Sequence, residues 1–519
     1  MKSVTRRNIL LGLLLTSLAI PAAFAQTITL PAPDAARLLA LNVNYTTAKN
    51  NALPSMTDQQ KAEIDKLEAA ARAAAGAGKY GEAMKNVHHA QAVVAGRAWS
   101  PLRQLNSSLV AKLSTALPEP GQSVVLKVGQ WYEPDEKVTG KLTAFVAVIR
   151  GGGIGGRVGS GASNEPTVLK TEEIESGDWL MKPATFTVTV PNLPDGTYSL
   201  GVMLRPATPG SDDAEVRAGA NMRIVRGAKA KVDALRARVA AMKDADPSAA
   251  YRVTLYDSVV AGDITLSRGT DLMAEIAEAN AILDEQAKHT DPWAARRGDM
   301  RKAYLSKADN TLQPYRLFLP AKYDGTKAYP LVIALHGMGG DENSMFEGYT
   351  EGTGGPNVVK KEAEARGYIV ACPKGRGTAD MYLGQAEQDV TDVLAEVRRV
   401  YKIDPQRIYL TGHSMGGYGT WSYSQAHPTI FAALAPISGG GNTAAMTKIA
   451  SIPQFVTHGD NDKTVPVERS REMVAAAKAA HTEIVYDEVP GGSHVSIAVP
   501  AFPKIFAFFD AHVKPKGAE

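Results

Sequence analysis

The segment that decides the fold reads Ile408-Tyr409-Leu410-Thr411-Gly412-His413-Ser414-Met415-Gly416-Gly417. Its first four residues are apolar or β-branched and predict a buried strand, and the residues after Ser414 predict the start of a helix. A serine hydroxyl is a poor nucleophile unless it protrudes where a base can reach it, and a sharp strand-to-helix turn provides that. Glycine two positions on either side makes such a turn sterically possible. Ser414 is therefore the candidate nucleophile.

A second segment predicts where the negative charge of an oxyanion would be stabilised. The predicted strand Tyr329–Leu335 ends in His336-Gly337-Met338-Gly339-Gly340, where a backbone N–H donor is expected. Met338 is the preferred donor, with Gly337 as the next choice. The other donor is the backbone N–H of Met415, because it lies at the start of the helix after the nucleophile.

Candidate acid and base groups follow two later strands. The stretch Phe455–Pro466 reads as a strand and then a loop that carries Asp460 and Asp462. His494 ends the sequence Gly491-Gly492-Ser493-His494, between a strand-like stretch and the predicted final helix. The chain order serine, aspartate, histidine is the order of α/β-hydrolases and differs from the orders in chymotrypsin and subtilisin.

From Leu312 onward, apolar strands alternate with amphipathic helices, of which Asp389–Tyr401 is the clearest. This alternation predicts a mostly parallel sheet that is covered by helices on both faces. The fold class expected for this part of the chain is therefore α/β.

Three motifs resemble those of a known superfamily: Gly412-His413-Ser414-Met415-Gly416-Gly417-Tyr418-Gly419, His458-Gly459-x-x-Asp462-x-x-Val465-Pro466 and Gly492-Ser493-His494. They resemble the α/β-hydrolases, and in particular the esterase and prolyl-oligopeptidase-like branch, which includes exported feruloyl, acetyl-xylan and polyhydroxyalkanoate-type esterases. The resemblance extends from about Leu312 to Val513. It implies that Ser414 attacks a carbonyl carbon, His494 transfers the proton and Asp462 orients the imidazole.

Other residues near these motifs have alternative interpretations. Asp460 is the rival acid, but the spacing Gly-x-x-Asp-x-x-Val-Pro favours Asp462. His336 and His458 precede glycines at strand ends and are interpreted as structural hydrogen-bonding groups, whereas His413 is interpreted as shaping the turn at the nucleophile. The loop Gly375-Arg376-Gly377 either lines the mouth of the active site or is simply solvated. No substrate-binding residue can be chosen from the sequence.

The residues before the hydrolase-like part divide by pattern. Residues 26–105 are Ala-rich with helical periodicity, and residues 106–227 contain short alternating strands separated by turn-formers, as in a β-sandwich. Helical periodicity returns over residues 228–308, which we interpret as a connector. Residues 309–519 are the expected α/β-hydrolase domain.

The first 25 residues have the layout of an export signal. Their first seven residues include the basic Lys2, Arg6 and Arg7, the apolar run Ile9–Ile20 follows, and the cleavage pattern Ala23-Phe24-Ala25 comes last. The adjacent Arg6 and Arg7 also fit a twin-arginine signal, and an ordinary signal peptide is the alternative. The sequence therefore predicts an exported protein, periplasmic or secreted, with no membrane span after signal removal.

Charge and cysteine content exclude several classes. The formal net charge of the 519 residues is +3, and removing the basic leader leaves 54 basic and 54 acidic residues. A neutral chain argues against nucleic acid as a partner. The single cysteine, Cys372, follows apolar residues and is interpreted as a core residue. No spacing of histidine or cysteine indicates a metal site, and acyl transfer by Ser414, Asp462 and His494 needs no cofactor.

We therefore expect an exported serine hydrolase that cleaves carboxylic esters, with a small-molecule or carbohydrate ester as its substrate. A prolyl-oligopeptidase-like peptidase is the first alternative. Such peptidases usually carry a large β-propeller, and the β-rich residues 106–227 are too few for many four-stranded blades. A non-catalytic protein that binds carbohydrate or protein on a hydrolase scaffold is the second alternative.

Overall fold

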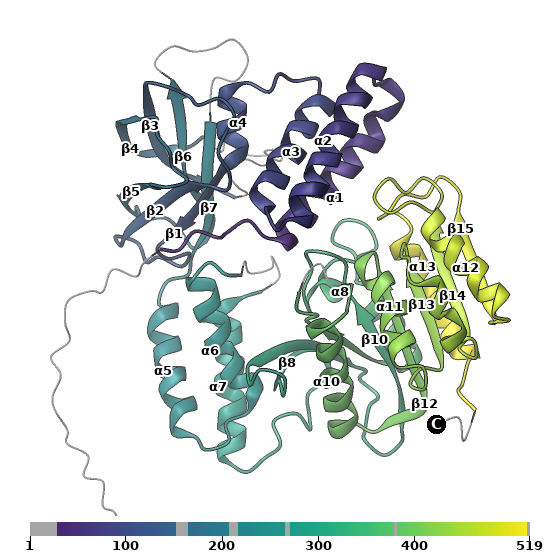
Figure 1. Ribbon diagram of the computed structural model, residues 1–519. Helices are drawn as coiled ribbons and strands as arrows, with labels where there is room; N and C mark the ends of the chain where they lie inside the picture. Colours follow the sequence, from purple (N-terminus) through teal and green to yellow (C-terminus); the bar gives the residue numbers. More distant parts are fainter. Residues whose placement is uncertain (1–27, 152–164, 207–215, 265–269, 378–380, 516–519) are drawn as a thin grey trace, which may run out of the picture.

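The computed structural model describes residues 28–151, 165–206, 216–264, 270–377 and 381–515. Along the chain these residues form a group of helices, two antiparallel sheets, a second group of helices and a large eight-stranded sheet (Figure 1). The signal predicted at residues 1–25 lies outside the described residues. Within the described ranges, no helix is both long and apolar enough to cross a bilayer.

The first group consists of four α-helices and one 3₁₀ turn: α1 (Ala35–Ala52), the turn Leu53–Ser55, α2 (Asp58–Gly76), α3 (Tyr80–Val94) and α4 (Pro101–Ser108). Helix α2 begins with a capping box, in which Thr57 and Gln60 satisfy each other's backbone N–H groups. Ile64 of α2 and Met84 of α3 are buried in the shared core of these helices. The apolar stripes thus hold α2 against α3.

The two antiparallel sheets pack face to face. One contains β1 (Leu109–Leu113), β2 (Ser123–Gln130) and β5 (Ala184–Thr189), and the other contains β3 (Lys141–Arg150), β4 (Thr167–Glu175), β6 (Gly196–Pro206) and β7 (Val216–Ile224). Alternate residues of both sheets, such as Val124 and Leu126 of β2 and Leu142 and Ala144 of β3, enter one core. This period of two is what a sandwich requires, because successive side chains of a strand point to opposite faces.

The second group of helices contains α5 (Ala228–Ala241), α6 (Pro247–Val260) and α7 (Leu272–Ala287). We expected helical structure to continue to residue 308, and this is wrong for the last part. Gly298–Leu305 form strand β8, which pairs antiparallel with β9 (Leu312–Leu319). The segment Asp299-Met300-Arg301-Lys302 lacks the alternation of a half-exposed strand, because polar and apolar side chains alike are enclosed by α6 and the neighbouring strand.

The large sheet has the strand order β15-β14-β13-β12-β10-β11-β9-β8. Besides β8 and β9, it contains β10 (Tyr329–Leu335), β11 (Ile369–Pro373), β12 (Ile403–His413), β13 (Ala433–Ile437), β14 (Gln454–Gly459) and β15 (Ile484–Val489). Strands β10 to β15 are mutually parallel, whereas β9 is antiparallel to both of its neighbours. The predicted α/β class with a mostly parallel sheet is confirmed.

Helices cover both faces of this sheet: α8 (Ser344–Glu347), α9 (Val358–Arg366), α10 (Gln385–Val400), α11 (Met415–Ala426), the 3₁₀ helix Thr443–Ile449, α12 (Glu468–Ala479) and α13 (Ala498–Ala511). Leu331, Ile333 and Leu335 of β10 enter the core shared with α10, α11 and the connector helices. Val332 and Ala334 enter the opposite core with α9 and α13. Because both faces are covered, β10 is apolar throughout rather than alternating.

The order of the strands decides where a site can form. The chain passes from β10 to β11 on one side and then to β12 on the other side of β10. The carboxyl ends of β10 and β12 therefore lie where the strand order reverses, which is the usual ligand position in open α/β sheets. The residues His336–Gly340, called here the β10 loop, and Ser414 both lie at this edge.

Candidate active site

Ser414 occupies the sharp turn between β12 and α11. Its φ of 60° and ψ of −117° are unusual for a residue with a side chain, and the surrounding packing maintains them. A Cβ atom on Gly416 would lie 2.1 Å from the carbonyl oxygen of Leu335, so the first turn of α11 packs directly on the end of β10. Only glycine permits this approach, which raises the Ser414 side chain above the sheet edge.

The structure brings Ser414, His494 and Asp462 together. The Ser414 Oγ lies 2.9 Å from Nε2 of His494, and Nδ1 of the same ring lies 2.6 Å from Oδ2 of Asp462. Because a carboxylate only accepts hydrogen bonds, Nδ1 carries the ring proton and Nε2 is free to accept from the serine hydroxyl. The three groups form one continuous chain of hydrogen bonds.

Asp462 is held by four donors. Its Oδ1 accepts from the backbone N–H groups of Thr464 at 2.8 Å and Val465 at 2.9 Å. Its Oδ2 accepts from His494 and, at 3.2 Å, from Nε2 of His458. Burial alone would raise the pKa of this carboxyl, but the hydrogen bonds from His458 and His494 outweigh it and lower the pKa below its ordinary value. The side chain is thus a fixed negative charge beside the imidazole.

The rival acid lies elsewhere. Asp460 accepts a hydrogen bond of 2.6 Å from the backbone N–H of Gly491, whereas Nδ1 of His494 bonds to Asp462. The two loops meet closely, because a Cβ atom on Gly459 would lie 2.2 Å from the carbonyl oxygen of Gly492. Asp460 thus ties the two loops together, whereas Asp462 meets the imidazole.

His413, next to the nucleophile, holds the backbone of His494. Its Nε2 lies 2.8 Å from the carbonyl oxygen of His494, and its Nδ1 lies 2.9 Å from the hydroxyl of Tyr349. The carbonyl can only accept, so Nε2 carries the proton and Tyr349 donates to Nδ1. Burial lowers the pKa of His413 to about 4, with a smaller contribution from the positive form of His494. The ring is therefore neutral near neutral pH.

This burial predicts a specific loss of stability in acid. The imidazole of His413 has the ordinary histidine pKa of about 6.5 when the chain is unfolded, but a pKa of about 4 when it is folded. Between these values the unfolded state binds more protons, so the free energy of unfolding falls as pH falls, by up to about 3 kcal/mol. We expect His413→Gln, which keeps an N–H donor, to lose less thermal stability than wild type between about pH 7 and about pH 5. Equal losses in the two proteins would contradict the assignment.

The β10 loop lies against the nucleophile. A Cβ atom on Gly337 would lie 3.5 Å from Cβ of Ser414, and the backbone N–H of Gly340 donates to Gly337 at 3.1 Å. Met338 is half-buried, and Met415 is the first residue of α11, where no preceding helical turn can accept its N–H. Both predicted oxyanion donors thus belong to segments that border Ser414.

Arg376 is used by the scaffold. Its guanidinium forms ion pairs with Asp389 at 2.7 Å and with Asp309, and the side chain is largely buried. We had interpreted the loop Gly375-Arg376-Gly377 either as lining the mouth of the active site or as solvated. Arg376 instead forms a structural ion pair with Asp389 of α10. Cys372 is buried in β11, and burial raises the pKa of its thiol.

Sequence reasoning missed two features beside the site. One is a hollow of about 400 Å³ beside α11, which is lined by Met381, Leu383 and Tyr418. Tyr418 lies one helical turn after the nucleophile, and its backbone N–H donates to the carbonyl oxygen of Ser414. In addition, α1 reaches the loop that carries the acid. Asn50 donates to the carbonyl oxygen of Lys463 at 2.7 Å, and the hydroxyls of Thr47 and Thr464 are 3.0 Å apart. No motif signals such contacts, because they join residues more than 400 positions apart.

Within the described ranges, no three His, Cys, Asp or Glu side chains are grouped so that they could hold a metal ion. The ionisable groups that meet at the edge of the sheet are those of Ser414, Asp462 and His494, flanked by His413 and His458. This arrangement can activate a hydroxyl and transfer its proton.

Comparison with known proteins gives partial matches. Residues 360–453 match the prolyl oligopeptidase family. The bifunctional acetylxylan esterase/xylanase XynS20E of Neocallimastix patriciarum is 32% identical over 136 residues, which are 26% of this chain and 19% of that protein. A probable feruloyl esterase C of Aspergillus terreus is 29% identical over 161 residues, 31% of this chain and 58% of that protein. The chain thus spans less than two thirds of these relatives.

A thermostable esterase of known crystal structure covers 78% of this chain and 100% of its own, with a TM-score of 0.38 and 18% identity. The parallel sheet, its strand order and the turn at Ser414 define the C-terminal part of the chain as an α/β-hydrolase. This fold agrees with the similarity of residues 360–453 to the prolyl oligopeptidase family and with the esterases among the similar proteins.

Proposed function

We propose that this protein is a serine hydrolase that cleaves carboxylic esters through an acyl-enzyme. The observation that carries the proposal is the unbroken chain from Ser414 through His494 to Asp462, with distances of 2.9 and 2.6 Å. Such a chain couples removal of the serine proton to stabilisation of the imidazolium that results.

Each group has a defined role in the proposed reaction. The Ser414 Oγ forms a bond to the ester carbon as its proton passes to Nε2 of His494, and the Asp462 carboxylate offsets the imidazolium charge. The N–H groups of Met415 and Met338 stabilise the oxyanion. The bond to the alcohol then breaks, and His494 returns the proton to the leaving oxygen. A water molecule repeats the sequence and releases the acid and free Ser414.

The chemical class of the substrate is proposed from the relatives and the hollow. The matched relatives are named as acetylxylan and feruloyl esterases, which favours an ester of a carbohydrate. The apolar side chains of Met381 and Leu383 line the hollow beside α11, where the acyl group would be sheltered from water. Action on a carbohydrate ester outside the cytoplasm is consistent with the export that the leader predicts. The export route would be either the general or the twin-arginine route.

A peptidase is the second candidate, because residues 360–453 match the prolyl oligopeptidase family. The two candidates are separated by comparing p-nitrophenyl acetate with a prolyl p-nitroanilide on the same preparation. We expect kcat/KM for the ester to exceed that for the anilide by at least about 10³ if the protein is an esterase. Faster cleavage of the anilide would instead assign the protein to the peptidases.

A further inference from the structure

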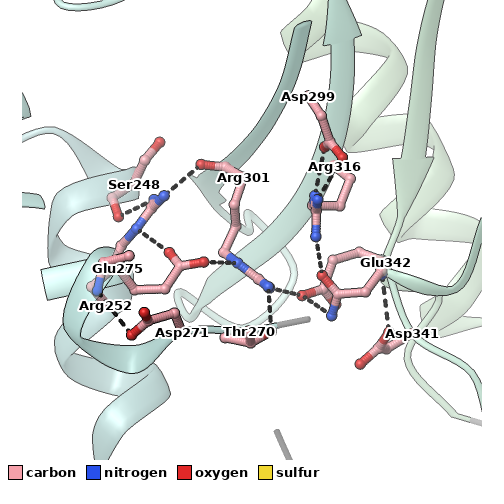
Figure 2. Close-up of polar contacts among 12 residues, drawn as sticks. Ser248, Arg252, Thr270, Asp271, Glu275, Asp299, Arg301, Arg316, Asp341 and Glu342 are labelled. Atoms are coloured by element: carbon pink, nitrogen blue, oxygen red, sulfur yellow. Dashed lines mark hydrogen bonds and ion pairs between the residues drawn. The ribbon is translucent and has the colours of Figure 1, made fainter. Parts of the chain in front are cut away.

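A cluster of charged side chains is buried between the connector helices and the β10 loop (Figure 2). It consists of Arg252 on α6, Glu275 on α7, Arg301 on β8 and Glu342, which follows the β10 loop. The side chains of Arg301 and Glu342 are each 4% exposed, and that of Arg252 is 3% exposed. The proposed chemistry uses none of these residues.

Arg301 is the centre of the cluster. Its NH1 donates to Oε1 of Glu342 at 2.6 Å, and its Nε donates to Oε1 of Glu275 at 2.9 Å. Arg252 completes the network, because it donates to Oε2 of Glu275 at 2.9 Å and to the carbonyl oxygen of Arg301 at 2.9 Å. Two cations therefore face two carboxylates, and Arg301 joins the connector to the segment after the β10 loop.

Stability alone does not account for such a network. Removing four charges from water is costly, and well-packed apolar side chains often serve a core equally well or better. A buried ion pair does, however, fix two backbones in one relative position, because its strong hydrogen bonds are directional. The useful question is which backbone Arg301 fixes.

That backbone is the β10 loop. Glu342 lies two residues after Gly340, and the intervening turn is closed by a bond of 3.0 Å from the N–H of Asp341 to Oγ of Ser344. Asn343, the residue after Glu342, is held by Arg316 of β9, whose NH1 donates to Oδ1 of Asn343 at 2.7 Å. The other end of the loop is tied by His336, whose Nε2 lies 2.7 Å from the carbonyl oxygen of Lys374. The loop thus has anchors at both ends.

We propose that Arg301 is a positioning residue for the β10 loop: its ion pair with Glu342, supported by Glu275 of the connector, holds the loop where its backbone N–H groups meet the oxyanion. The connector is then part of the catalytic scaffold rather than a spacer. This inference rests on the proposed serine-hydrolase function.

The test removes the Glu342 carboxylate and measures the number of active sites separately from kcat. We expect Glu342→Ala to lower kcat by about 10²-fold, with KM changed by less than about threefold, because a displaced loop weakens the transition state more than substrate binding. The kcat is measured with p-nitrophenyl acetate per site that gives a p-nitrophenol burst, so unfolded molecules do not count. Glu342→Gln keeps an oxygen acceptor for Arg301 and is expected to retain most of the wild-type kcat.

Arg296→Ala is the matched control, since Arg296 pairs with Glu278 and Glu285 in the connector region without touching the segment after the β10 loop. It is expected to keep the wild-type kcat per active site. If Glu342→Ala also keeps that value, or if Arg296→Ala loses as much, the inference is overturned while the hydrolase function stands. A folded wild-type protein with neither burst nor turnover would instead refute the proposed function.

Discussion

Replacement of Ser414 by alanine is expected to remove ester hydrolysis almost completely, with kcat reduced by on the order of 10⁶-fold. Without the hydroxyl, no acyl-enzyme can form, and His494 has no proton to accept at 2.9 Å. Any residual rate would come from the oxyanion donors and from substrate binding alone. The measurement is turnover of p-nitrophenyl acetate together with labelling by a fluorophosphonate, and both are expected to vanish.

Ser422 provides a control on the same helix. Its hydroxyl donates to the carbonyl oxygen of Met381 at 2.8 Å, away from the imidazole, so Ser422→Ala should still be labelled. Labelling that survives in Ser414→Ala would show that another residue reacts. A folded wild-type protein that resists the probe would favour the non-catalytic binding protein instead.

Asp462→Asn should cause the second-largest loss, about 10⁴-fold in kcat. The asparagine amide can donate to Nδ1 of His494 and thereby place the ring proton on Nε2, where it blocks acceptance from Ser414. Electrostatic support for the imidazolium is lost at the same time. The change in shape is small, and the amide oxygen can still accept from the N–H groups of Thr464 and Val465.

Asp460→Asn is the matched variant, because it makes the same chemical change two residues earlier. Asp460 bonds the N–H of Gly491 rather than the imidazole, and an amide oxygen can replace that contact. We expect its kcat to stay within about threefold of wild type. Reversed results, with Asp460→Asn the more damaging change, would transfer the acid role to Asp460 and refute the mechanism proposed here.

Local patterns predicted the hydrolase part of the fold well. The strand before Ser414, the apolar run Tyr329–Leu335 and the helix near Asp389–Tyr401 each have an unambiguous period, so their positions follow from the side chains alone. Strand β8 was not predicted, because Asp299, Arg301 and Lys302 are charged and only enclosure by distant elements allows them to lie in a buried strand. The partners of Arg301 could not be predicted from the sequence either, because they lie on elements far away along the chain.

The sequence alone predicts which residues would carry the proposed chemistry, because the glycine spacing around Ser414 and the order of Ser414, Asp462 and His494 can be read from the chain without its partners in space. The contacts that hold these side chains in place are visible only in the folded chain. The fold places Asp462 against the imidazole and Asp460 against the backbone of Gly491, on two loops that meet at Gly459 and Gly492. The anchoring of the β10 loop depends on Arg301 meeting Glu275 and Glu342 from separate elements. The sequence gives the charge of a long side chain but not its partner, because packing between distant elements decides which charged groups meet.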